Sequence, residues 1–72
     1  MQRKRTLEEI PMMEFVRTTA LVLKNLGISE EQSYGIIIAV SSSKMLIGNF
    51  MLWAYDNNPT EEQIMHWIVE HT

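Results

Sequence analysis

The sequence predicts an all-α protein, a small bundle of three to four helices joined by short loops. Apolar residues recur at helical spacing, Ser or Thr stands three residues before Gln at two points, and Gly or Pro separates the apolar segments. With 72 residues and 46% hydrophobic side chains, the chain has room for one domain and is too apolar for a disordered polypeptide. We therefore expect a single helical domain over residues 1–72.

The charges are distributed unevenly along the chain. Arg3, Lys4 and Arg5 hold three of the six basic residues, and the rest carries three basic against nine acidic residues, a net charge of −6. We expect residues 1–5 to be a flexible, solvated tail. The lack of cysteine excludes disulfides and thiolate metal sites, and no apolar segment of a secretory signal follows the basic start. Both observations favour a cytoplasmic location.

The first helix is predicted over about residues 11–26. Pro11 suits its start, because proline is tolerated in the first turn but disrupts a helix interior. A short turn is expected before it, at residues 6–9. Gly27 suits the left-handed position that ends a helix. The predicted inner face consists of Phe15, Thr19, Val22 and Leu26.

The second and third helices are predicted over about residues 30–40 and 43–56. The sequence SEEQ at 29–32 is typical of a capping box, in which the serine hydroxyl accepts from the amide three residues later. The segment IIIAV would also suit a strand, but this cap and the lack of a pairing strand favour a helix. Three serines at 41–43 are expected to separate the two helices, and one continuous helix is the alternative.

The fourth helix is predicted over about residues 60–71. It begins with a second capping-box sequence, TEEQ, and Ile64, Trp67 and Ile68 fall on its inner face. Asn58 precedes Pro59, which favours an extended backbone there and a stop to the third helix.

The second and third helices carry apolar residues on more than one face, which is more than a small bundle shields. An exposed apolar patch is typical of an interface. We therefore expect a homodimer, a complex with a larger protein, or both, and we expect one of the two tryptophans to be partly exposed. The predicted interface residues are Ile36, Val40, Met45, Phe50, Met51 and Trp53.

No sequence pattern indicates catalysis or a cofactor. The serines at 41–43 lack the glycine-rich surroundings and the aligned base of a nucleophile, so helix capping is the better interpretation. Glu62, His66 and Glu70 share one helical stripe, but a solvated stripe is expected rather than a metal site. The prediction is a non-enzyme without catalytic, cofactor-binding or metal-binding residues.

Two alternatives remain open. The second and third helices with their serine turn have suitable lengths for a DNA-binding helix-turn-helix. Arg3, Lys4, Arg5 and Lys44 would then contact phosphates, although the negative body of the chain opposes this. A single membrane span over residues 34–55 is the lesser alternative, because the serines and Lys44 would be costly in a bilayer.

The segments LKNLGISEEQ and AYDNNPTEEQIMHWIVE resemble small uncharacterised helical proteins carried by prophages and mobile elements of Firmicutes. The resemblance implies a short accessory protein that acts by binding a larger protein, such as a host or defence factor, and inhibiting it. It includes no defined motif, so no site residue follows from it.

Overall fold

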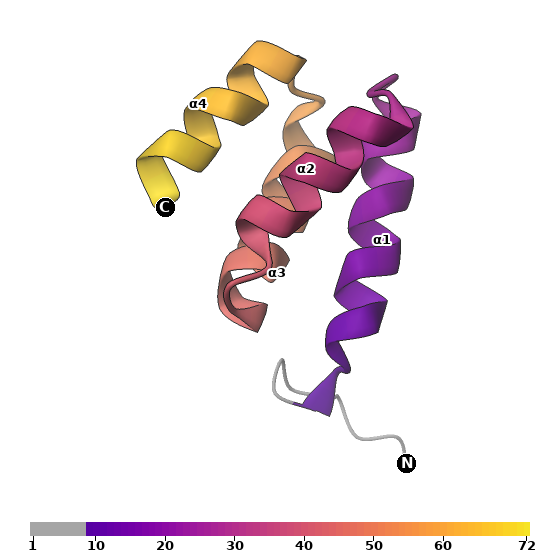
Figure 1. Cartoon of the computed structure of the whole chain (residues 1–72), viewed down its shortest axis with the longest axis vertical. Coiled ribbons are helices and arrows are strands. Elements are labelled where there is room, and N and C mark those ends of the chain that lie inside the picture. Colours follow the sequence, from indigo (N-terminus) through magenta and orange to yellow (C-terminus); the bar gives the residue numbers. More distant parts are fainter. Residues whose placement is uncertain (1–8) are drawn as a thin grey trace.

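In the computed structural model, which describes residues 9–72, the chain forms four α-helices (Figure 1). The all-α prediction is confirmed, and each helix boundary lies within one residue of its predicted position. The expected basic tail and most of the expected turn at 6–9 lie outside the described residues. The helices are α1 (Met12–Asn25), α2 (Glu30–Val40), α3 (Lys44–Asn57) and α4 (Glu61–His71).

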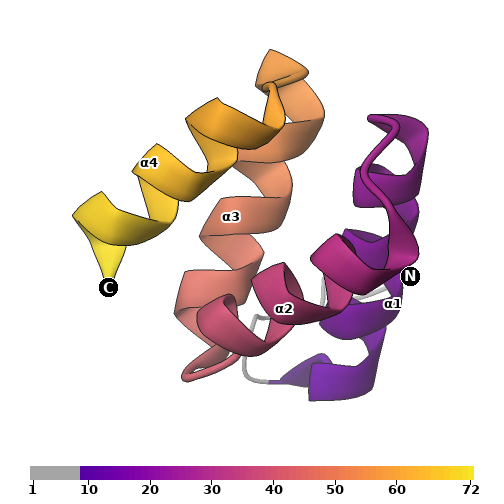
Figure 2. The same ribbon diagram turned by 45° about the horizontal axis from the view of Figure 1, so that its top comes forward.

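Helices α1 and α3 run in the same direction and pack most extensively against each other (Figure 1). Helix α2 crosses them both as the return segment, since two neighbouring helices of the same direction need a connection that brings the chain back. Helix α4 leaves the end of α3 and folds back on the side of α3 that is remote from α1 (Figure 2). The bundle therefore has α3 at its centre.

Side-chain hydroxyls define the starts of α2, α3 and α4. Ser29, Ser43 and Thr60 each accept a hydrogen bond from the backbone N–H three residues later, at 3.2, 3.0 and 3.2 Å. At Thr60 the Gln63 side chain also accepts from the Thr60 backbone N–H at 2.9 Å, so the capping box is complete. At Ser29 only the hydroxyl half of the predicted box is present. Each cap contributes roughly 1 kcal/mol.

The end of α1 is the predicted glycine stop. Gly27 adopts a φ of +83°, in the left-handed region. Its N–H donates to the Lys24 carbonyl at 3.0 Å, and the Ile28 N–H donates to the Leu23 carbonyl at 3.1 Å. These two bonds satisfy carbonyls that the helix end would otherwise leave without donors.

The serines separate α2 from α3, so the alternative of one continuous helix is wrong. The Ser41 hydroxyl donates to the Ile37 carbonyl at the end of α2, and Ser43 is extended, with φ −154° and ψ 156°. The prediction for Asn58 is also wrong, because its φ of 47° and ψ of 53° are left-handed rather than extended. Asparagine tolerates this conformation, and the Asn58 N–H still donates to the Ala54 carbonyl at 3.1 Å.

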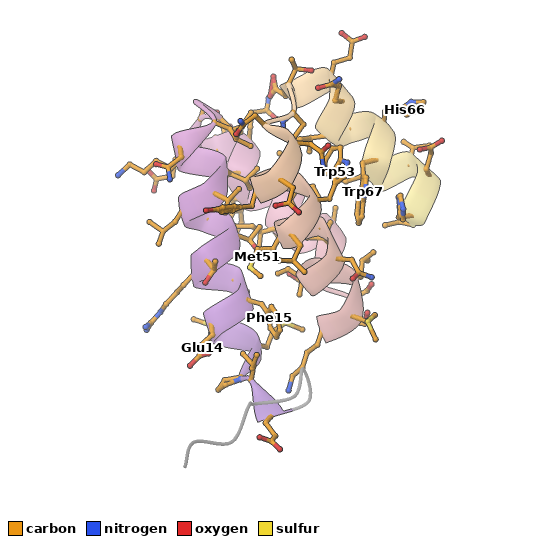
Figure 3. The ribbon with its side chains drawn as sticks, turned by 180° about the vertical axis from the view of Figure 1, so that it is seen from behind. Glu14, Phe15, Met51, Trp53, His66 and Trp67 are labelled. Atoms are coloured by element: carbon orange, nitrogen blue, oxygen red, sulfur yellow. The ribbon has the colours of Figure 1, made fainter. Side chains whose placement is uncertain are left out.

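One core joins all four helices. Figure 3 shows Phe15 of α1 pointing toward α3, and Trp67 of α4 lying beside α3 from the other side. The predicted inner face of α4 is confirmed, because its three residues are all buried. Burial of each large apolar side chain stabilises the fold by about 1.5–3 kcal/mol. The buried apolar residues are Phe15, Leu23, Ile36, Val40, Ile47, Phe50, Ala54, Ile64, Trp67 and Ile68.

Candidate interaction surfaces

The six residues predicted to form an interface do not share one surface. Ile36, Val40 and Phe50 are buried in the core, which corrects the expectation that they face a partner. They are buried because α2 and α3 turn these side chains toward α1 and α4. Met51 and Trp53 are half-buried, and Met45 is exposed. Since Trp67 is buried, the expectation that one tryptophan is partly exposed is confirmed.

The exposed sides of α2 and α3 also point in opposite directions. The buried faces of both helices meet in the same core, so the opposite faces lead away from each other. Helix α2 is in front in Figure 1, whereas α3 is in front in the view from behind in Figure 3. Tyr34 and Ile38 of α2 therefore lie on a different side of the molecule from Met45 and Leu52 of α3.

Large apolar side chains remain exposed on every helix. The exposed fraction of these side chains is between 48% and 75%, in a chain whose whole accessible surface is 5447 Å². Scattered single residues of this kind are normal on a soluble protein, so their grouping is the informative feature. They are Met13, Leu21, Tyr34, Ile38, Met45, Leu52, Tyr55, Met65 and Val69.

Two of these exposed residues, Leu21 and Tyr34, line a groove between α1 and α2, which we call the α1–α2 face. Two adjoining hollows form it, and both include the small residues Ala20 and Ser33. Small residues at these positions leave a depression that larger neighbours border. The apolar neighbours are Val16 and Leu21 on α1, Ile28 in the loop, and Tyr34 and Ile37 on α2.

The two rims of the α1–α2 face carry opposite charges. Arg17 and Lys24 of α1 stand on one rim, and Glu30 and Glu31 in the first turn of α2 stand on the other. None of the four forms an ion pair with another residue of the described part, residues 9–72. The glutamates also lie in the first turn of α2, where acidic side chains interact favourably with the helix dipole.

Two others, Met65 and Val69, lie on α4, which an aromatic cluster holds against α3. The rings of Trp53 and Trp67 lie 5.6 Å apart with an interplanar angle of 25°. Phe50 meets the Trp67 ring edge-on at 5.2 Å and 63°, and the His71 ring stacks on Trp67 at 3.8 Å. Such pairs contribute roughly 0.5–1.5 kcal/mol beyond the area that they bury.

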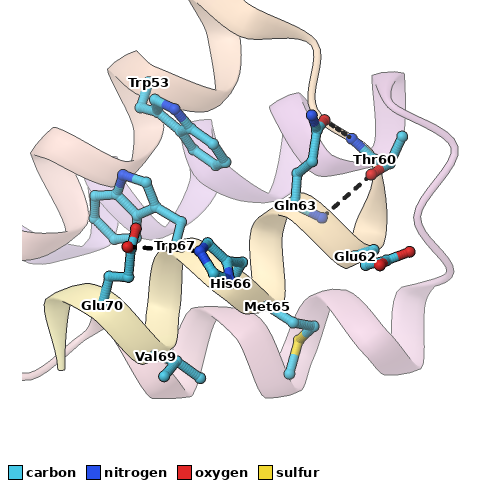
Figure 4. A pocket seen from close by; sticks show the side chains of 9 residues that line it. All are labelled: Trp53, Thr60, Glu62, Gln63, Met65, His66, Trp67, Val69 and Glu70. Carbon is cyan, nitrogen blue, oxygen red and sulfur yellow. Dashed lines mark hydrogen bonds and ion pairs between the residues drawn. The ribbon is translucent and has the colours of Figure 1, made fainter.

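An open, shallow hollow covers the outer side of α4, and we call it the α4 surface. Its lining combines apolar side chains, namely Trp53, Met65 and Val69, with a stripe of Glu62, His66 and Glu70. Figure 4 shows the two tryptophans on one side of α4, and Met65 and Val69 on the other. Apolar contacts are therefore available on both sides of a polar stripe.

The charge of the α4 surface has one sign. Between residues 45 and 72 the chain has no lysine or arginine, and it has four acids: Asp56, Glu61, Glu62 and Glu70. The only basic group of the hollow is the imidazole of His66, whose Nε2 lies 3.5 Å from a Glu70 carboxylate oxygen. The stripe considered for a metal thus contains an i,i+4 pair, and within residues 9–72 no group of three suitable ligands lies together.

The structure describes one of the four residues of the helix-turn-helix alternative. Arg3, Lys4 and Arg5 lie outside the described residues, and Lys44 is half-buried at the start of α3. The outer face of α3 carries Met45, Asn49, Leu52 and Asp56, which include no basic group. Within the part of the chain that the structure describes, no helix has the length and apolarity that a bilayer crossing requires.

Sequence reasoning missed the contribution of α1 to the surface. Leu21 lies on α1 between Arg17 and Lys24, outside the predicted inner face, and is 62% exposed. An exposed leucine among charges on an outward face was the available signal. The small residues Ala20 and Ser33 gave no such signal, because the depression that they leave depends on how α2 crosses α1.

Comparisons with known protein families, with curated proteins and with solved structures found no match for this chain.

Proposed function

We propose that the chain is a non-catalytic protein-interaction module that associates with a second copy of itself through the α1–α2 face. The observation that carries the proposal is the combination of an apolar groove with rims of opposite charge. We also propose a wider role in binding and inhibiting a larger protein, which is the role that the resemblance stated for the sequence would imply.

The charge pattern favours a second copy as the occupant of the groove. A two-fold axis that runs along the groove places α1 of each copy over α2 of the other. Lys24 and Arg17 of one copy then lie opposite Glu30 and Glu31 of the partner, and the same contacts form twice. Complementary charges on the rim steer association and fix its orientation.

A dimer of ordinary size would cover only a small part of the surface of this chain. A stable interface buries about 800 Å² on each partner, which is about one seventh of the 5447 Å² surface of this chain. Leu21 and Tyr34 are 62% and 70% exposed, so both have apolar area to lose. Burial of apolar area is the main favourable term in such association.

The test is size-exclusion chromatography with light scattering across a concentration series. We expect a mass of twice 8.4 kDa at high concentration. Tyr34→Lys adds a charge to the groove and is expected to give a monomer. Leu52→Lys makes the same kind of change at a site with 57% exposure on the outer face of α3, and is expected to remain dimeric.

A charge reversal tests the orientation. Lys24→Glu and Glu30→Lys are each expected to weaken the dimer, and the double variant is expected to restore it, because the opposite charges face each other again. Circular dichroism checks that each variant is folded. A chain that stays monomeric at high micromolar concentration contradicts the proposal, and so does a dimer that Leu52→Lys abolishes and Tyr34→Lys does not.

A further inference from the structure

The α4 surface has features that self-association through the α1–α2 face does not use. Trp53 is half-buried, with one part of its ring stacked on Trp67 and the remainder open to the hollow. Met65 and Val69 are 48% and 75% exposed, one turn apart on α4. Trp53 and Met65 flank the polar stripe on opposite sides, and each is a large, polarisable side chain that suits an adaptable contact.

The polar part of this surface is acidic. Glu62 and Glu70 lie two turns apart on α4, with His66 midway between them. Within residues 9–72 neither carboxylate has a lysine or arginine partner, and the ion pair of Glu70 there is with His66. A cationic group on a partner would therefore meet negative charge and an open tryptophan ring, and both attract it.

We infer that the α4 surface is a second docking site, and that its occupant is a basic amphipathic helical segment of another protein. Such a segment lies along α4, with apolar side chains on Trp53 and with lysine or arginine over Glu62 and Glu70. Amphipathic helices bind apolar surfaces in this way, through side chains spaced one turn apart. The inference does not depend on the proposed dimer, because the two surfaces share no residue.

The charge pattern separates this occupant from a second copy. The α1–α2 face is self-complementary because it carries both signs, whereas the α4 surface carries carboxylates alone apart from His66. Two α4 surfaces facing each other would bring Glu62 and Glu70 of both copies together, which is unfavourable. The partner must therefore supply the positive charge.

The experiment uses the full chain and a synthetic amphipathic helix of leucine and lysine that contains no tryptophan. Trp53 and Trp67 are the only tryptophans of the chain, so their emission reports on this surface. We expect a blue shift that saturates as the peptide is added, because Trp53 loses contact with water. A peptide with glutamate in place of lysine is expected to cause no shift, and added salt is expected to weaken the binding.

Matched charge reversals locate the site. Glu62→Lys with Glu70→Lys is expected to weaken peptide binding at least tenfold, and Glu62→Gln with Glu70→Gln to weaken it less. Glu30→Lys with Glu31→Lys changes the net charge equally on the α1–α2 face, and is expected to leave peptide affinity unchanged while it disrupts the dimer. Loss of the dimer and loss of peptide binding at the α4 surface can thus be distinguished.

Three results would overturn the inference. The first is equal binding of the basic and the acidic peptide, and the second is equal loss of affinity in both charge-reversed pairs. The third is a shift of tryptophan emission when the chain alone is diluted, which would mean that copies of the chain cover this surface for one another.

Discussion

The α1–α2 half and the α3–α4 half of the molecule are built in different ways. In the first half, a glycine ends α1 before α2 begins, and the groove between the two helices is lined by small residues and carries both signs of charge. In the second half, large rings fill the space between the helices, and the exposed side carries acids. The first half suits an identical partner, and the second suits a partner of opposite charge.

The comparison shows that apolar content does not locate an interface in a small bundle. Helix α2 carries apolar residues on several faces, yet Ile36 and Val40 are buried in the core, and Ala20 of α1 lines the groove beside α2. The placement of charge around an apolar area distinguishes one surface from another. Substitutions within the core and the helix ends test how independent the two halves are.

The largest expected effect is that of Phe50→Ala. The Phe50 ring is fully buried and contacts both tryptophan rings, so its removal leaves a cavity between α3 and α4. We expect a loss of about 3–5 kcal/mol in the free energy of unfolding. Urea denaturation followed by circular dichroism measures this. Leu52→Ala on the exposed face is the control, and a comparable loss there would mean that the aromatic cluster does not hold the halves together.

Substitutions of two glycines in the α1–α2 half are expected to change the stability of the fold in opposite directions. Gly27→Ala is expected to destabilise by about 1–2 kcal/mol, because a side chain at a φ of +83° is strained even though no atom lies within 4 Å of the added carbon. Gly35→Ala, inside α2 and equally free of contacts, is expected to stabilise by roughly 0.5–1 kcal/mol. Thermal unfolding measures the stability of both variants. Destabilisation by Gly35→Ala would show that a neighbouring group packs against Gly35.

Removal of a buried hydroxyl in α1 is expected to stabilise the fold. The Oγ1 of Thr19 is fully buried, and it has no hydrogen-bond partner among residues 9–72. Replacement by valine keeps the shape and removes the unsatisfied group, so Thr19→Val is expected to stabilise by about 1 kcal/mol. A higher urea midpoint with an unchanged slope is the expected result. A lower midpoint would indicate that the hydroxyl is hydrogen-bonded in solution.

The smallest expected difference is between two helix caps. Thr60→Ala removes a complete capping box, and Ser29→Ala removes a single bond. Both are expected to destabilise by about 1 kcal/mol, with Thr60→Ala the larger. Hydrogen exchange measured residue by residue is the sharper readout, since Thr60→Ala is expected to lower protection mainly in α4. Equal loss of protection throughout the chain would mean that the two halves unfold as one unit.

Local signals made the helix positions predictable. A cap, its partner three residues later and a glycine stop are read within a few residues, so Ser43, Thr60 and Gly27 mark the observed ends. The inner face of α4 was predictable as well, because its apolar residues follow one stripe. Asn58 was not, because the rule for residues before proline leaves the left-handed region open to asparagine.

The surfaces were predictable only in part. Over residues 35–40 α2 has no polar side chain, so periodicity could not choose between the buried Ile36 and the exposed Ile38. That choice is made by the angle at which α2 crosses α1 and α3, which no local signal encodes. The acidic character of the α4 surface was readable from the stripe of Glu62, His66 and Glu70, but its apolar flanks appear only once α4 folds back beside Trp53.

The order of the helices also has a kinetic consequence. The closest helix pair, α1 with α3, is joined by residues 26–43, which include the whole of α2. Every other connection is a turn of a few residues, so most contacts form between segments that are near in the chain. Bundles dominated by such local contacts fold within microseconds to milliseconds. Closure of the α1–α3 pair is the one step that must wait for an entire helix to form, and we expect it to limit the folding rate.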